Sequence, residues 1–140
     1  MYARARVTDA ETNAVAFVFE NCQVWAIDTG LLAIDPSTLS FTDIYNSMCS
    51  RLPRYGRFAQ SLGNQPPFRW IAALERVNER RLEVQTQGGG ISHLGEPCLR
   101  DQVFSEGSYD GIQESRLALA PFLGELFRRC SMQFPEYLQR

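Results

Sequence analysis

The chain has 140 residues, of which 44% are hydrophobic and 21% are charged, and its formal net charge is −2. This length fits one domain, residues 1–140, that buries an ordinary hydrophobic core. The composition excludes a disordered chain, and no apolar run reaches the roughly 18 residues that a membrane-spanning helix needs. The N-terminal residues lack the apolar core of a signal peptide, so the sequence predicts a soluble cytoplasmic protein.

The four cysteines are Cys22, Cys49, Cys98 and Cys130, and none of them forms a CxxC pair. A cytoplasmic chain of this length does not need disulfides to fold, so we expect four reduced and mostly buried thiols. Only His93 could join them in a tetrahedral zinc site, and the spacing of metal ligands is absent. The sequence therefore predicts no metal and no cofactor.

The N-terminal part of the chain has the period-two pattern of strands, in which Val15 and Phe17 alternate with smaller residues. This pattern predicts an antiparallel β-meander of residues 2–8, 14–20 and 22–28. A turn at Thr29 and Gly30 is then expected to lead into a short extended piece, residues 31–34.

A first helix is predicted to begin after Ser40, which with Asp43 forms a capping pair. Apolar side chains recur at helical spacing up to Leu52, and Pro53 is expected to end the helix. Residues 54–64, which contain two glycines, are then predicted to form a loop or a broken short helix.

A second helix is predicted to open at Pro66 and Pro67, because proline suits the first helical turn and Phe68, Ile71 and Leu74 follow at helical spacing. Alternation from Leu82 to Thr86 predicts one further strand, which the glycines at 88–90 interrupt. Residues 91–111 have no regular pattern, apart from one helical turn expected at 99–104.

The last helix has the clearest pattern, with apolar residues spaced as on one helical face from Leu119 to Cys130 and Pro121 at its start or at a kink. The tail is expected to pack through Phe134 and Tyr137. The chain is therefore predicted to be an α+β domain of two layers, with an N-terminal antiparallel meander, three main helices and one further strand.

Basic residues gather in one segment of this mildly acidic chain. All 14 basic residues are arginine, and residues 51–81 hold seven arginines against two glutamates, a local balance of +5. Arginine binds carboxylates and phosphates with two parallel hydrogen bonds, and aromatic residues beside it can stack on a ligand. An ordinary solvated helix face with the same composition is the alternative.

The arginine segment favours a non-enzymatic binding or regulatory protein, such as an inhibitor or adaptor, over an enzyme. The expected partner is an acidic protein surface or a phosphate-bearing ligand. Nucleic acid fits less well, since the isoelectric point is near 5.4. The predicted contact residues are Arg54, Arg57, Arg69, Arg76 and Arg80, with Tyr55 and Trp70 as aromatic anchors.

The competing class is a small nucleotide-binding or hydrolase-like domain that uses His93 beside these arginines. A lone histidine can act as a general acid or base, but the members of a catalytic site normally converge from separate elements. The triple glycine at 88–90 lacks the spacing of a phosphate-binding loop. No catalytic residue is therefore assigned.

Residues 28–61 contain three short motifs, Asp35-Pro36, Asp43-Ile44 and Arg54-Tyr55-Gly56. In this order they resemble the opening segment of phage and bacterial HD-type metal-dependent phosphohydrolases. The resemblance implies a strand, a turn and a helix before the first metal histidine. The histidines of that family have no counterpart here, which implies that a related chain has lost the metal and the hydrolysis that a metal-activated water carries out.

Overall fold

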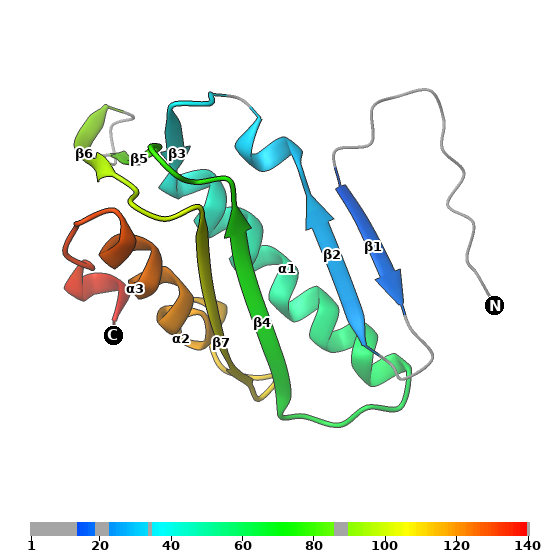
Figure 1. The fold of residues 1–140 in the computed structure, drawn as a ribbon. Coiled ribbons are helices and arrows are strands. Elements are labelled where there is room, and N and C mark those ends of the chain that lie inside the picture. The colour runs from blue at the N-terminus through cyan, green and yellow to red at the C-terminus, as the bar shows by residue number, and fades with distance from the viewer. Residues whose placement is uncertain (1–13, 19–22, 34, 86–89, 140) are drawn as a thin grey trace.

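The structure is a computed structural model that describes residues 14–18, 23–33, 35–85 and 90–139 (Figure 1). Its strands are β1 (Ala14–Val18), β2 (Val24–Asp28), β3 (Thr38–Ser40), β4 (Phe68–Glu75), β5 (Arg81–Gln85), β6 (Ile91–Pro97) and β7 (Gln102–Tyr109). The α-helices are α1 (Phe41–Ser61), α2 (Ser115–Ala118) and α3 (Ala120–Arg129), and two 3-10 turns are η1 (Gly30–Leu32) and η2 (Glu136–Leu138). The α+β class is confirmed, and the described part of the chain has three α-helices, though not all of them lie where they were predicted.

The N-terminal hairpin agrees with the prediction where the structure describes it. Strands β1 and β2 pair antiparallel, with Ala14 opposite Asp28 and Val18 opposite Val24. The expected strand at 2–8 lies outside the described residues. The expected extended piece after the hairpin is wrong, because Gly30–Leu32 forms a 3-10 turn in which Leu31 N–H donates to the Asp28 carboxylate at 3.1 Å.

Helix α1 begins as predicted but runs nine residues further. Ser40 is its N-cap and accepts a hydrogen bond from the Asp43 N–H at 3.3 Å. Pro53 lies inside the helix and does not end it. Beyond Pro53, buried Gly56 lets the helix approach Tyr109 of β7, where an added Cβ would lie 3.0 Å from the ring. The helix therefore continues past Pro53 and packs on β7, although proline removes one backbone hydrogen bond.

Strand β4 pairs antiparallel with β7, and β5 pairs antiparallel with β6. The two pairs follow each other along the chain and form one ribbon with a bend. Backbone hydrogen bonds continue through the bend: Val77 N–H donates to Asp101 O at 3.1 Å, and Cys98 N–H donates to Arg80 O at 2.8 Å. In the β4–β7 arm, Phe68 faces Tyr109 and Glu75 faces Gln102. Strand β5 also pairs in parallel with β3, so α1 forms part of a crossover connection.

The helix predicted to start at Pro66 is wrong, since residues 68–75 form β4. The spacing of Phe68, Ile71 and Leu74 fits a helix, but the burial alternates: Trp70 and Leu74 are buried, whereas Ile71 is 61% exposed. The prediction of irregular structure with a helical turn at 99–104 is also wrong. Strand β7 occupies 102–109. Two residues on its more buried face, Ser105 and Gly107, are small and not apolar, so the sequence lacks the alternation of apolar and polar residues that is typical of a strand.

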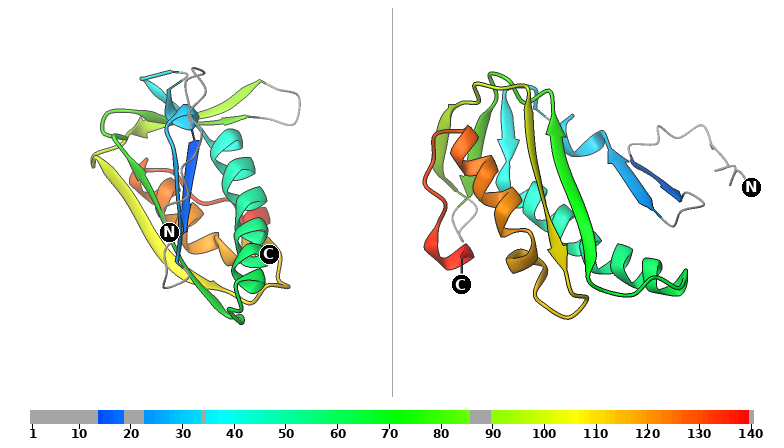
Figure 2. Two further views of the ribbon diagram at one scale, coloured as in Figure 1. Left: turned by 90° about the vertical axis from the view of Figure 1, so that its right-hand side faces the viewer. Right: turned by 60° about the horizontal axis from the view of Figure 1, so that its bottom comes forward.

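Helices α1 and α3 lie on the same side of the β4–β7 arm, as Figure 2 shows. At the centre of the core, the Phe127 ring of α3 lies 5.0 Å from that of Phe41 and 5.4 Å from that of Phe134, measured between centroids. The predicted packing of Phe134 is confirmed, and the side chain of Tyr137 lies outside the described residues. No helix in the described part of the chain is long and apolar enough to cross a membrane.

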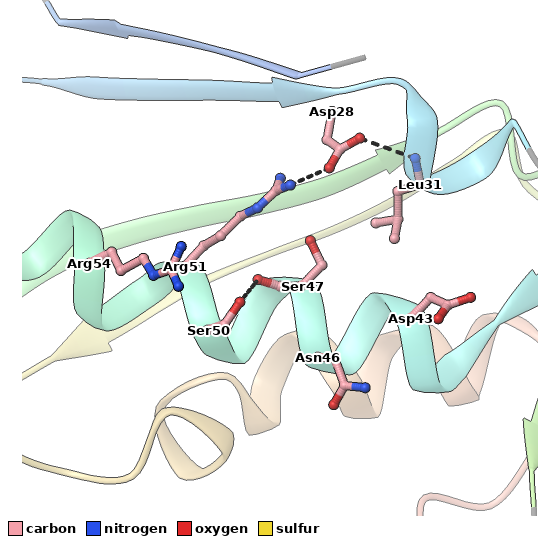
Figure 3. A pocket seen from close by; sticks show the side chains of 8 residues that line it. All are labelled: Asp28, Leu31, Asp43, Asn46, Ser47, Ser50, Arg51 and Arg54. Atoms are coloured by element: carbon pink, nitrogen blue, oxygen red, sulfur yellow. Dashed lines mark hydrogen bonds and ion pairs between the residues drawn. The ribbon is translucent and has the colours of Figure 1, made fainter. Parts of the chain in front are cut away.

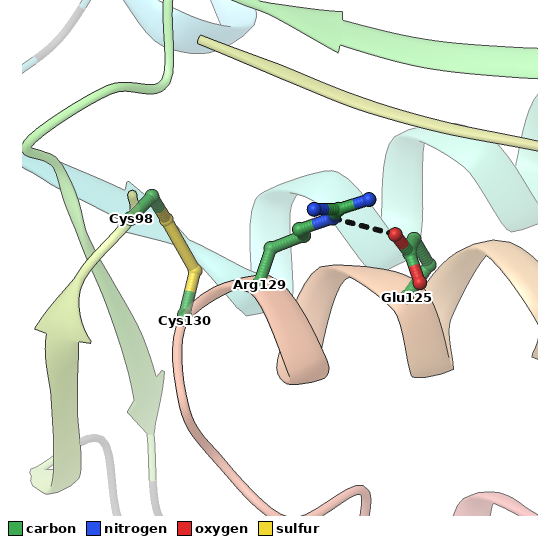
Figure 4. The surroundings of a disulfide bond; sticks show 4 residues. All are labelled: Cys98, Glu125, Arg129 and Cys130. Carbon is green, nitrogen blue, oxygen red and sulfur yellow. Dashed lines mark hydrogen bonds and ion pairs between the residues drawn. A yellow bond between two sulfur atoms is a disulfide. The ribbon is translucent and has the colours of Figure 1, made fainter. Parts of the chain in front are cut away.

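The prediction that all cysteines are reduced is wrong, because Cys98 and Cys130 form a disulfide (Figure 4). It joins the bend of the ribbon to the C-cap of α3, and both residues are buried. Cys49 is a free thiol, and Cys22 lies outside the described residues. The cytoplasmic location stays a prediction, and this bond does not favour it, because disulfides are rare in reducing compartments.

The disulfide closes a separation of 32 residues, and a loop of that length is expected to contribute about 3 to 4 kcal/mol through the entropy of the unfolded chain. We therefore predict that the double variant Cys98→Ala/Cys130→Ala loses about that much free energy of unfolding in urea titrations. Cys49→Ala, which removes the free thiol, is the control and should lose less. Equal losses for the two variants would contradict a stabilising disulfide.

Gly107 leaves room for the indole of Trp70 directly across the ribbon. An added Cβ at Gly107 would overlap with Cζ2 and Cε2 of the Trp70 indole. Gly107→Ala should therefore cost about 1 to 3 kcal/mol of unfolding free energy through overpacking. The matched control is Gly124→Ala in α3, where the nearest atom would be 3.6 Å away; alanine there should stabilise by about 0.5 to 1 kcal/mol. A neutral Gly107→Ala would show that the indole does not occupy this place.

Candidate functional site

Three of the predicted contact residues lie on the C-terminal half of α1. Arg54 and Arg57 are exposed, and Tyr55 is half-buried. Within the described residues, neither arginine has an ion-pair partner. These two guanidinium groups are therefore open to solvent on one stretch of helix.

Arg69 lies elsewhere, on the solvent-exposed face of β4. Its guanidinium donates to Glu106 Oε2 of β7 at 2.5 Å, and this hydrogen bond raises the pKa of Arg69. The side chain is 73% exposed, so the pair contributes little to stability. A carboxylate of its own chain thus already occupies this arginine.

Arg76 and Arg80 lie in the bend of the ribbon. Arg76 has a left-handed backbone, with φ of 58°, and is exposed. Arg80 donates to Leu32 O at 2.7 Å and so connects η1 to the ribbon. We conclude that Arg80 has a structural role, and that the structure does not bring the five predicted arginines together on one surface.

Trp70 was expected to be an aromatic anchor for a partner, and this expectation is wrong. The side chain lies on the inner face of β4, is 8% exposed and belongs to the hydrophobic core. Among the residues that the structure describes, its Nε1 finds no hydrogen-bond partner. The indole therefore serves packing against Gly107 and is not available at the surface.

An open groove of about 510 Å³ runs between α1 and the end of the hairpin (Figure 3). Its α1 wall is a stripe of polar side chains at helical spacing, opposite the apolar stripe that faces the core. The groove is lined by Asp28, Leu31, Asp43, Asn46, Ser47, Ser50, Arg51 and Arg54. Seven of these eight residues are polar, so the groove suits a polar ligand.

An ion pair between Arg51 and Asp28 crosses the groove from α1 to the end of β2. The two side chains are 32% and 16% exposed. Burial acts to raise the pKa of Asp28, but the hydrogen bonds from Arg51 and from the Leu31 N–H, with the charge of Arg51, outweigh it and lower the pKa. The carboxylate is therefore ionised at neutral pH and holds Arg51 in place.

Arg54 lies beside Arg51 in the groove wall, and Figure 3 shows both side chains on the hairpin side of α1. The hydroxyl of Ser50 donates to Ser47 O at 3.1 Å and keeps its oxygen as an acceptor. Arg54 is the exposed cation of this lining. This end of the groove can therefore form charge-assisted hydrogen bonds to a carboxylate or phosphate.

A second cavity, of about 350 Å³, lies between α1 and the C-terminal turn and contains Phe41, Tyr45 and Arg116. Arg116 donates to Glu114 at 2.6 Å. Nearby, burial raises the pKa of the Cys49 thiol, so it stays protonated at neutral pH. This cavity therefore offers neither an exposed cation nor an activated nucleophile.

His93 lies on β6 with its backbone opposite Val84, and its side chain lies outside the described residues. Within the part of the chain that the structure describes, no group of three or more His, Cys, Asp or Glu residues could hold a metal ion. The nucleotide-binding or hydrolase-like alternative therefore stays a prediction without an observation that favours it.

Sequence reasoning found Arg54 but missed most of the groove lining. The lining residues that were not predicted as contact residues are Asp28, Leu31, Asp43, Asn46, Ser47, Ser50 and Arg51. The signal was present, because the α1 members recur at helical spacing. These α1 residues lie close to Asp28 only because of where the hairpin packs, and no local sequence pattern indicates that position.

Comparison with protein-family models, with curated proteins and with solved structures finds no match. The resemblance of residues 28–61 to HD-type phosphohydrolases therefore stays a prediction. What the protein does has to be inferred from the groove itself.

The pKa of Asp28 lies below its ordinary value of 3.8 in the folded state, so the Arg51 pair stabilises the protein above that pH and loses its effect as the pH falls through the folded-state pKa. We predict that Asp28→Asn lowers the free energy of unfolding at pH 6 and that the difference from wild type shrinks towards pH 3. Urea titrations at several pH values measure it. A difference that is independent of pH would contradict the pairing.

Proposed function

We propose that the protein is a non-enzymatic binding protein that docks an acidic segment of a partner protein in the groove along α1. Arg54 makes the main contact in this proposal, and Arg51, whose charge Asp28 already compensates, forms the groove wall beside it. The observation that carries it is the position of Arg54, an exposed cation in a polar groove with no ion-pair partner among the described residues.

The openness of the groove favours a protein segment over a small molecule. Small-molecule sites are concave and mostly apolar, and they bury most of the ligand, whereas this groove lies open between one helix and the hairpin (Figure 3). Two exposed apolar residues follow Arg54 at helical spacing, Phe58 in α1 and Leu62 at its C-cap, which are 41% and 40% exposed. They give a bound segment apolar contact area next to the cation.

The role of Arg54 can be tested by NMR titration with two probes, a short peptide rich in glutamate and inorganic phosphate. We predict that the peptide shifts the amide signals of residues 47, 50 and 54. Arg54→Gln should weaken this binding about 2- to 5-fold, because one exposed ion pair contributes up to about 1 kcal/mol.

The matched control is Arg76→Gln, which removes an exposed arginine in the bend of the ribbon and should leave the affinity unchanged. Equal effects of the two variants would mean that the peptide senses only net charge, and the proposal would fail. If inorganic phosphate binds and the peptide does not, the result favours a phosphate-bearing ligand and overturns the choice of a protein segment.

A further inference from the structure

The two ends of the groove carry opposite charges. Asp43 lies at the start of α1 and Arg54 eleven residues later, and both belong to the groove lining. Within the described residues neither has an ion-pair partner. The groove thus presents an exposed carboxylate at one end and an exposed guanidinium at the other.

The middle of the groove is electrically neutral. The charges of Arg51 and Asp28 cancel in their ion pair, and the rest of the lining between the ends is uncharged, with the polar residues Asn46, Ser47 and Ser50 and the apolar Leu31. A ligand that complements the whole groove therefore needs charge at its two ends and neutral polar groups between them.

The distance between the ends sets the length of that ligand. Eleven helical residues span about 16 Å at roughly 1.5 Å each. An extended peptide rises about 3.3 Å per residue, so two side chains about five residues apart reach both ends. Similar spacing on a helical ligand would span only about half that distance.

Building on the proposed function, we infer that the groove takes an extended peptide segment that carries a basic residue and an acidic residue about five positions apart. The acidic side chain binds Arg54 and the basic side chain binds Asp43. The charges then fix the direction in which the segment lies along α1.

The test uses the full chain and three acetylated, amidated hexapeptides, with affinities measured by NMR titration. The first is Lys-Ser-Ser-Ser-Ser-Glu, the second has Gln in place of Lys, and the third is Ser-Ser-Lys-Glu-Ser-Ser, with the charges adjacent. The first peptide should bind about 2- to 5-fold more tightly than either of the others, as expected for one exposed ion pair.

Asp43→Asn should remove this advantage of the first peptide over the second. The fold should survive, because the cap at Ser40 uses the backbone N–H of residue 43. The matched control is Asp101→Asn, which changes an exposed carboxylate in the bend of the ribbon and should keep the advantage.

The inference is overturned if Lys and Gln peptides bind wild type equally, or if Asp43→Asn leaves their ratio unchanged. The proposed function fails by a different result, in which Arg54→Gln does not weaken binding of the Gln-containing peptide. The two failures are therefore distinguishable within one set of titrations.

Discussion

The groove depends on the ion pair between Arg51 and Asp28, which fixes the end of the hairpin against α1. In the described part of β2, few apolar side chains pack the hairpin against α1, since Trp25 and Ile27 are 58% and 52% exposed. Leu31, in the 3-10 turn that follows β2, lines the same groove and packs against the core. A charge pair that is partly buried has a defined geometry but a small net energy. It can therefore position the hairpin without adding much stability.

The rest of the molecule supplies a rigid base for this groove. The bent ribbon is hydrogen-bonded through its bend, the disulfide connects the bend to the end of α3, and Phe41 and Phe127 pack α1 on α3. With its apolar stripe buried in this core, α1 has only its polar stripe left to face the hairpin. The charges of the groove are thus placed by a helix whose orientation the core determines.

Secondary structure was predicted correctly where the local signals agree. The prediction failed where the spacing of apolar residues fits both a helix and a strand. The cap at Ser40 and the apolar stripe of the last helix are local, and both are confirmed. Phe68, Ile71 and Leu74 fit a helix as well as a strand, and only pairing with β7 decides for the strand. Arginines that are close in sequence were expected to share a surface, but a strand sends Arg69 and Trp70 to opposite faces. Arg54 was found from the clustering of arginines in residues 51–81, although the sequence placed it in a loop or a broken short helix and the structure places it in α1, whereas Asp28 required the tertiary position of the hairpin.

The most direct test of this account is the exchange with water of the arginine guanidinium protons, measured by NMR on uniformly labelled protein. If Asp28 holds Arg51 across the groove while Arg54 stays open to a ligand, the protons of Arg51 should exchange measurably more slowly than those of Arg54. Asp28→Asn should then bring the Arg51 rate up to that of Arg54. Equal rates for the two arginines in the wild-type protein would contradict the account, because the groove would then have no fixed wall on its hairpin side.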